Sequence, residues 1–223
     1  MKSVVNDGSS GENTSQGGAR SDQLTLGQMT DAFKQALHMG AERVVEQIGV
    51  KDGFNKDTAI HIPLPEKLGQ VKTLLAPMGM SGMVDDLELK LNRAAEAATP
   101  KARALFMKAI EEMTFDDVKK IYQGPNDSAT TYFREKMTGL LKDEMRPIVD
   151  DTLSEVGAVQ AYDQVMGQYK TIPMVPDVKA DLTDHVLTKG IYGIFHYMAR
   201  EEAAIRENPV KQTTELLKTV FGK

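Results

Sequence analysis

Apolar residues recur every three or four positions along most of the chain, which is the spacing that aligns one face of an α-helix. The first such run extends from Leu26 to Ile48, and Gly49 follows it where a C-terminal cap is expected. Between Val186 and Met198 the apolar residues nearly surround the helix axis, which is typical of a central, buried helix. The pattern therefore predicts an all-α fold.

Prolines, glycines and capping residues divide this pattern into about nine helices with short connections. Pro100 follows Thr99 and is predicted to begin a new helix, because proline at the first helical position costs no hydrogen bond. Pro147 is predicted to break or kink a helix. Pro209 is predicted to begin the last one.

Three parts of the chain lack the helical pattern. Residues 59–65 and 172–176 contain prolines that favour extended backbone, and both are expected to cross the helices without pairing in a sheet. Residues 1–23 are rich in Gly, Ser, Asn and Asp and are expected to form a flexible tail. The predicted architecture is this tail followed by one bundle-like domain over residues 24–223.

The composition narrows the classes of function. The chain has 223 residues, of which 41% are hydrophobic and 26% charged, a net charge of −5 and no cysteine. The lack of cysteine excludes disulfide scaffolds, thiolate metal sites and cysteine nucleophiles, and the acidic balance argues against nucleic-acid binding. No apolar run approaches the roughly 18 residues of a transmembrane helix, and the N-terminus has no signal-peptide pattern. Phosphate-loop, dinucleotide, nucleophile-elbow and HExxH motifs are also absent, so no catalytic residue, cofactor or metal site is predicted.

Two polar stripes run along predicted helices and form the main candidate binding site. Their members are Glu88, Asn92, Arg93 and Glu96 in the first stripe and Asp127, Thr130 and Arg134 in the second. If the stripes face each other, Arg93 and Arg134 can pair with carboxylates around a pocket for an anion. The alternatives are a structural polar network that fixes the helix register, or a solvated face. A metal-dependent enzyme would instead require the oxygens of Glu88, Glu96 and Asp127 to converge.

A second candidate site involves two of the four histidines. His185 and His196 are eleven residues apart in one predicted helix, and Tyr192 lies between them on the same face. At 1.5 Å of rise per residue they are about 16 Å apart, which is too far to share a metal ion. The three side chains are predicted either to line an internal pocket or to act as packing residues.

Methionine is abundant, with 13 residues, several of them between Met78 and Met83. The flexible thioether side chain suits an adaptable apolar surface for a lipid tail or a partner helix. Filling the core is the alternative use.

Several ungapped blocks are similar to the bacterial family called domain of unknown function 4197. The blocks are IPLPEKL (62–68), LELKLNRAAE (87–96), EMTFDD (112–117), GPNDSATTYFREK (124–136), ADLTD (180–184) and TTELLK with a later Phe (213–221). The resemblance implies an all-helical bacterial protein of the exported or lipid-anchored type, without an assigned activity. Because the sequence lacks a signal peptide and a lipidation cysteine, we expect either a mature periplasmic or envelope protein or a cytoplasmic member.

These observations together predict a non-enzymatic envelope protein. It is expected to bind a small apolar, lipid-like or anionic ligand, or a protein partner, between its helices. A carboxylate-based metal-dependent enzyme and a purely structural interaction module are the two alternatives.

Overall fold

The computed structural model describes residues 26–175 and 181–207, and all regular secondary structure within these two ranges is helical. The α-helices are α1 (Leu26–Ile48), α2 (Glu66–Leu75), α3 (Ser81–Glu111), α4 (Phe115–Gln123), α5 (Ser128–Glu155), α6 (Ala158–Tyr169) and α7 (Leu182–Glu207). A single 3-10 turn, η1 (Ala76–Met78), joins α2 to the short connection before α3. The prediction of an all-α protein is confirmed. The tail at residues 1–23 and the helix expected after Pro209 lie outside the described residues.

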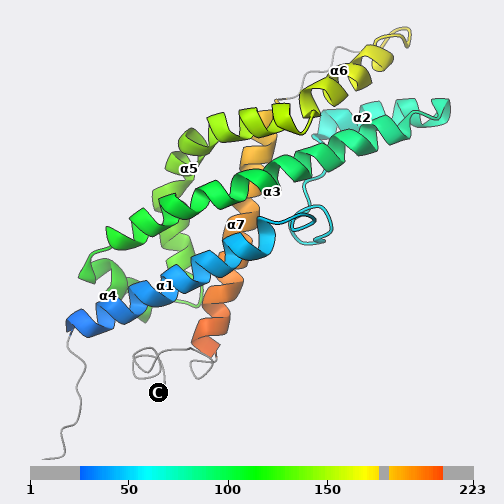
Figure 1. Cartoon of the computed structure of the whole chain (residues 1–223). Helices are drawn as coiled ribbons and strands as arrows, with labels where there is room; N and C mark the ends of the chain where they lie inside the picture. The colour runs from blue at the N-terminus through cyan, green and yellow to red at the C-terminus, as the bar shows by residue number, and fades with distance from the viewer. Residues whose placement is uncertain (1–25, 176–180, 208–223) are drawn as a thin grey trace, which may run out of the picture.

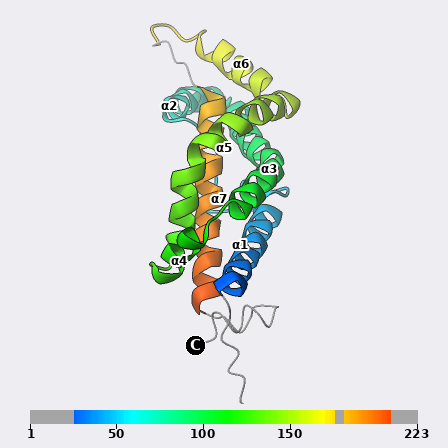
Figure 2. The same cartoon turned by 90° about the vertical axis from the view of Figure 1, so that its left-hand side faces the viewer.

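Helix α7 occupies the centre of the fold. It packs against α1, α3 and α5, and Figures 1 and 2 show it crossing behind α3, with α5 on one side and α1 on the other. At the crossing, the ring of Phe106 in α3 makes edge-to-face contacts with Phe133 in α5 and Phe195 in α7. The two ring-centroid distances are 6.2 and 6.1 Å. The prediction that this helix is central is confirmed, but its burial is incomplete, because Thr188, Lys189 and Tyr192 are exposed.

Gly193 shows why α7 can lie so close to its neighbours. A Cβ atom at this position would approach Phe54 Cε1 to 2.7 Å and Ile60 Cβ to 3.3 Å. Both residues belong to the segment that links α1 to α2, residues 49–65, which we call the linking segment. A larger residue at 193 would therefore push the linking segment away from α7.

The two prolines compare differently with the predictions: Pro100 was predicted to begin a new helix and does not, whereas a break or a kink was predicted at Pro147 and the helix continues through it. Pro100 is within α3 and Pro147 is within α5. The hydroxyl of Thr99 donates a hydrogen bond to the Ala95 carbonyl at 2.7 Å, and the Pro100 ring packs closely against Gly49 at the end of α1. Figure 1 shows α5 changing direction part-way along its length, as expected where proline removes a helical hydrogen bond. The described ranges contain seven α-helices, whereas about nine were predicted. The number is smaller largely because α3 and α5 each continue through a proline.

The two segments expected to be extended differ from each other. Residues 61–65 are free of helix and turn, as expected, whereas residues 59 and 60 belong to a turn. The side chains of Ile62 and Leu64 are buried. Residues 172–174 instead continue from α6 as turns, because the amide of Ile172 donates to the Tyr169 carbonyl at 3.1 Å. Met174 adopts a positive φ of 62° there and is fully exposed.

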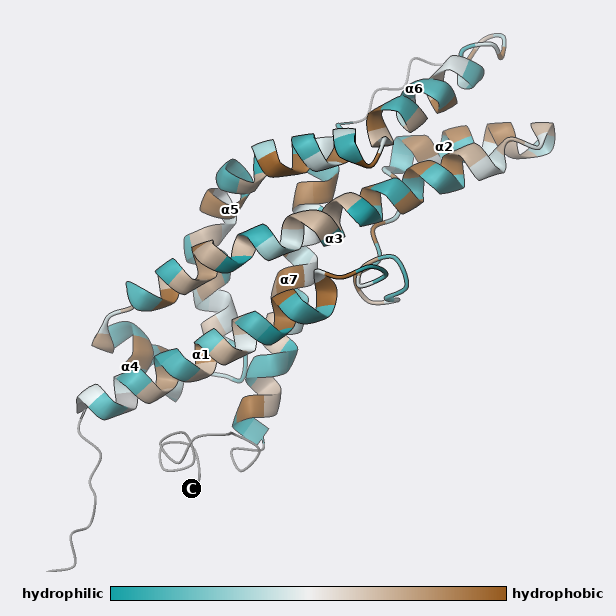
Figure 3. Ribbon diagram, viewed as in Figure 1, coloured by the Kyte–Doolittle hydropathy of each residue, from teal (hydrophilic) through white to brown (hydrophobic). Residues whose placement is uncertain are grey.

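Helix α2 with η1, the first turns of α3, and α6 with the turn that follows it extend together to one side of the crossing with α7, and we call this part the arm (Figures 1 and 3). Its helices pack against one another, since α2 contacts both α3 and α6. None of the described helices, in the arm or elsewhere, is both long enough and apolar enough to cross a membrane.

Candidate functional site

Asn92, in the first polar stripe, holds the linking segment against α3. The residue is fully buried, with 0% exposure. Its side-chain oxygen accepts a hydrogen bond from the Ile62 amide at 2.9 Å, and its side-chain nitrogen donates to the Ile62 carbonyl at 2.8 Å. The same nitrogen donates to the Glu88 carbonyl at 2.9 Å. Asn92 therefore satisfies both backbone polar groups of a buried residue that lies outside any helix.

Glu96 and Arg93 fix the beginning of the linking segment. The buried Glu96 carboxylate accepts hydrogen bonds from the amides of Phe54 at 3.1 Å and Asn55 at 3.0 Å. Its other oxygen accepts from Arg93 at 2.6 Å, and a second Arg93 nitrogen donates to Asp52 at 2.6 Å. Asp52 adopts the left-handed φ of 72°, an unfavourable conformation for a residue with a Cβ, and these contacts hold it there.

The charges around Asp52 agree with this geometry. Hydrogen bonds from Lys56 and then Arg93 hold the pKa of the Asp52 carboxyl far below its ordinary value. The hydrogen bond with Glu96 raises the pKa of Arg93 against the opposing effect of its burial. Asp52 and Arg93 are thus both ionised at neutral pH and form an ion pair with each other. Two nitrogens of the Arg93 guanidinium are thus engaged by carboxylates of the protein itself.

Three further contacts tie the rest of the linking segment to α3 and α7. His61 Nε2 lies 2.9 Å from the Glu88 carboxylate, and the Tyr197 hydroxyl donates to Asp57. His185 Nε2 donates to the Pro63 carbonyl at 2.7 Å. Burial disfavours the charged form of Asp57, but the hydrogen bonds from Tyr197 and from nearby amides outweigh it and lower its pKa. The first stripe and its partners therefore form a structural network, the second of the readings that the sequence allowed.

The second polar stripe has a different partner, on α7. The Glu202 carboxylate accepts hydrogen bonds from the amides of Ala129 at 2.9 Å and Thr130 at 2.8 Å, and from the Thr130 hydroxyl at 2.9 Å. Arg206 donates to Glu202 at 2.9 Å and to the Ile121 carbonyl at 2.8 Å. The first amides of a helix have no partner within it, and a negative charge at a helix N-terminus is favourable. Glu202 of α7 therefore acts as the N-terminal cap of α5.

Glu202 was not among the candidate site residues, because two adjacent acids, here Glu201 and Glu202, are typical of a solvated helix face. In the structure Glu202 is only 8% exposed. Glu201 remains nearer to solvent and lies 3.5 Å from Arg43. The signal that sequence reasoning missed is the spacing of Glu202 and Arg206, four residues apart, which allows them to pair within a buried site.

Asp127, the first residue of the second stripe, opens onto a hollow of about 270 Å³ between α4 and α5. The hollow is lined by Lys120, Ile121, Pro125, Asp127, Ser128, Thr131, Tyr132 and Glu135. Most of these residues were not singled out in the sequence, although Asp127, Thr131 and Glu135 have the four-residue spacing of one helix face. Burial and the charge of Asp117, which accepts its hydrogen bond, raise the pKa of Tyr132, so this hydroxyl stays protonated at neutral pH.

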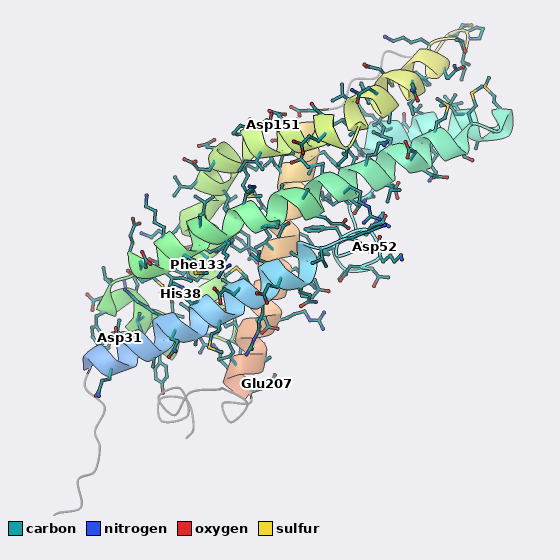
Figure 4. The ribbon with its side chains drawn as sticks, viewed as in Figure 1. Asp31, His38, Asp52, Phe133, Asp151 and Glu207 are labelled. Atoms are coloured by element: carbon teal, nitrogen blue, oxygen red, sulfur yellow. The ribbon has the colours of Figure 1, made fainter. Side chains whose placement is uncertain are left out.

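The two stripes do not share a site. Arg93 points to Asp52 in the linking segment, and Figure 4 shows Asp52 away from Phe133, which lies within the helix core. Arg134, at the end of the second stripe, lies with its guanidinium carbon 5.7 Å from the centre of the Phe195 ring. Glu88 and Glu96 both contact the linking segment, whereas Asp127 lies at the hollow between α4 and α5. Among the described residues, no group of three or more His, Asp or Glu side chains is placed to hold a metal ion.

The histidine face of α7 lies toward the surface. Tyr192 is 57% exposed, and its ring lies 6.0 Å from that of the partly exposed His196. Burial lowers the pKa of His185, so the neutral form donates its Nε2 proton to the linking segment. None of the three lines the hollow between α4 and α5. A role for them in a pocket stays a prediction.

The fold and these sites define an all-helical protein in which hydrogen bonds hold the linking segment against α3 and α7, and in which an open polar hollow lies between α4 and α5. Residues 23–222 match the model of the family described as Protein of unknown function (DUF4197). The chain belongs to this family. Comparisons with curated proteins and with solved structures gave no significant match.

The blocks that carry the family resemblance coincide with the sites described above. Residues 62–68 and 87–96 meet where Asn92 binds Ile62, and residues 124–136 provide most of the hollow. Residues 62–68 and 87–96 are thus explained by their packing against each other, whereas residues 124–136 also present an open, polar surface.

Proposed function

We propose that this protein is a non-enzymatic component of the bacterial envelope that binds a small polar ligand in the hollow between α4 and α5. The observation that supports the proposal is the hollow itself, about 270 Å³ in volume and lined by carboxylates, hydroxyls and a lysine around the buried Ile121. The sequence favoured an anionic ligand beside Arg93 and Arg134, or an apolar ligand at the methionine-rich residues 78–83. Since Arg93 is occupied by Glu96 and Asp52, the proposed ligand site moves to α5.

The lining of the hollow favours binding over catalysis. Its two carboxylates belong to Asp127 and Glu135, which are eight residues apart in the chain. Eight residues correspond to about 12 Å along a helix axis, farther than the spacing at which two carboxylates act on one bond. The envelope location is supported by the resemblance to exported and lipid-anchored proteins.

Native mass spectrometry of the protein isolated from the envelope fraction of its own host tests this function. We expect an added mass that disappears on denaturation. The variant Thr131→Trp fills the hollow and is expected to lose that mass. The matched control Leu140→Trp changes an exposed residue of the same helix outside the hollow and should keep it. A bare protein mass in the wild type, or an adduct unaffected by Thr131→Trp, contradicts the proposal.

A second candidate function is the binding of a partner protein through the arm, as the methionine content suggested. The observation that favours it is that five of the nine large apolar side chains exposed among the described residues lie on α2, η1, α3, α6 and the turn after α6. These side chains are Leu74, Met78, Leu89, Val159 and Met174. Exposed apolar side chains that lie on one part of a molecule are typical of interaction surfaces.

A further inference from the structure

We propose that the hollow between α4 and α5 is specific for a linear diammonium ligand, a diamine or short polyamine. The inference rests on the proposed function, because it names the chemical class of the ligand for the same hollow. Its basis is the arrangement of charge along α5, where a carboxylate stands at each end of the hollow and hydroxyl groups lie between them.

The Asp127 carboxylate is available to a ligand because another residue has replaced it at the helix end. Asp127 is the N-cap residue of α5, yet its side chain makes no capping hydrogen bond. The amides that it would normally bind, those of Ala129 and Thr130, are taken by Glu202. Within the described part of the chain, the Asp127 side chain has no hydrogen bond or ion pair, and it lies at the edge of the hollow.

Glu135 provides the matching charge at the far end. It lies on the same face of α5 as Asp127 and Thr131, because the three residues are spaced by four. The two carboxylates are separated along the axis by about 12 Å. Lys120 is the one cation in the lining, so two carboxylates and one ammonium give the hollow a net charge of −1. Nearby, Asp117 and Lys136 both interact with Tyr132 and offset each other.

The middle of the hollow suits a hydrocarbon chain with polar edges. Ile121 is buried and apolar, and Pro125 adds a second apolar surface. The protonated Tyr132 adds a neutral surface to the lining, and its ring already lies 5.8 Å from the Lys136 ammonium. The hydroxyls of Ser128 and Thr131 lie between the carboxylates, where they can accept hydrogen bonds from an internal amine. A dicarboxylate of the same length would meet like charges at both ends.

Titration of the full-length protein with three eight-carbon probes, followed by amide NMR shifts of residues 120–135, tests the ligand class. The probes are 1,8-diaminooctane, octylamine and octanedioate, which differ only in their end groups. We expect 1,8-diaminooctane to bind, octylamine to bind roughly five- to tenfold more weakly because one carboxylate lacks a partner, and octanedioate not to bind. Equal binding of the diamine and the monoamine overturns the diammonium specificity.

Two charge-removing variants provide the second measurement. Asp127→Asn and Glu135→Gln are each expected to weaken diamine binding roughly five- to tenfold. Glu144→Gln, an exposed acid on the same helix beyond the hollow, should leave it unchanged. Unchanged binding in both hollow variants overturns the inference. If octanedioate binds in the hollow and the diamine does not, the ligand class is wrong while the hollow remains a ligand site. If no probe shifts these amides and Thr131→Trp keeps the native adduct, both proposals fail.

Discussion

A single amide side chain determines the path of the linking segment. Asn92 presents an acceptor to one backbone group of Ile62 and a donor to the other, and water cannot replace it at a fully buried position. Neither aspartate, which lacks the donor, nor leucine, which has neither group, can make both contacts. The conformation of the chain between α1 and α2 therefore depends on the chemistry of this residue as well as on its size.

Replacement of Asn92 with alanine is expected to lower the free energy of unfolding by about 2–4 kcal/mol, because it leaves both buried polar groups of Ile62 without partners. Urea denaturation followed by circular dichroism measures the loss. Asn126→Ala, at an exposed position, serves as the control and is expected to change stability by less than about 0.5 kcal/mol. A similar small effect for both variants would show that the contact with Ile62 contributes little.

Part of this site was predictable from residue spacing alone. The four-residue repeat placed Glu88, Asn92 and Glu96 on one face, and the structure keeps them there. The partner of that face was not predictable, because it is a non-helical segment about 30 to 40 positions earlier in the chain. Periodicity defines which side chains share a face, whereas tertiary packing decides what the face contacts.

At the scale of whole helices, the junction between α5 and α7 depends on a charge supplied across the interface. Glu202 of α7 binds two free amides at the start of α5, and Arg206 connects it to the end of α4 through Ile121. Three helices therefore meet at one carboxylate. A local capping residue would stabilise α5 without fixing its position relative to α7.

Glu202→Gln is expected to lower the free energy of unfolding by about 1–3 kcal/mol, because the amide keeps only one acceptor oxygen and loses its charge. The neighbouring Glu201→Gln affects only a partly exposed pair with Arg43 and is expected to cost less than about 1 kcal/mol. Thermal unfolding of the two variants gives the comparison. The assignment of Glu202 is wrong if Glu201→Gln is the more harmful change.

The helix boundaries show where local rules are overridden. Proline is tolerated in the first turn of a helix, so Pro100 and Pro147 are reasonable boundaries in sequence terms. In the structure α3 and α5 continue through both prolines, because their buried residues on either side pack into the same core. The missing hydrogen bond produces a bend in α5 without ending the helix.

At the scale of the molecule, the described residues have two unlike regions. Most apolar side chains around α7 are buried, with Tyr192 and Leu140 as exposed exceptions, whereas the arm carries several exposed apolar side chains, among them Met78 at 49% and Met174 at 102% exposure. Flexible methionine side chains can adapt to partners of different shape. The arm is therefore the region in which a protein partner is expected to bind.

A photo-crosslinking residue placed at position 174 is expected to form a discrete adduct in cells if the arm has such a partner. Position 140 on α5 provides a control that is also exposed, at 60%, but lies outside the arm. The adducts are separated by size and identified by mass spectrometry. The partner-binding function is contradicted if position 174 forms no adduct or only those formed at position 140.

The central position of α7 also has a consequence for biosynthesis. This helix begins at Leu182, so a ribosome has already made α1, α3 and α5 before the helix that packs against all three emerges. The incomplete chain cannot form the aromatic contacts around Phe195 or complete the start of α5 with Glu202. The native contacts of the core are therefore completed only after α7 has left the ribosome, and a chain stalled before Leu182 leaves the sides of α1, α3 and α5 that face α7 uncovered.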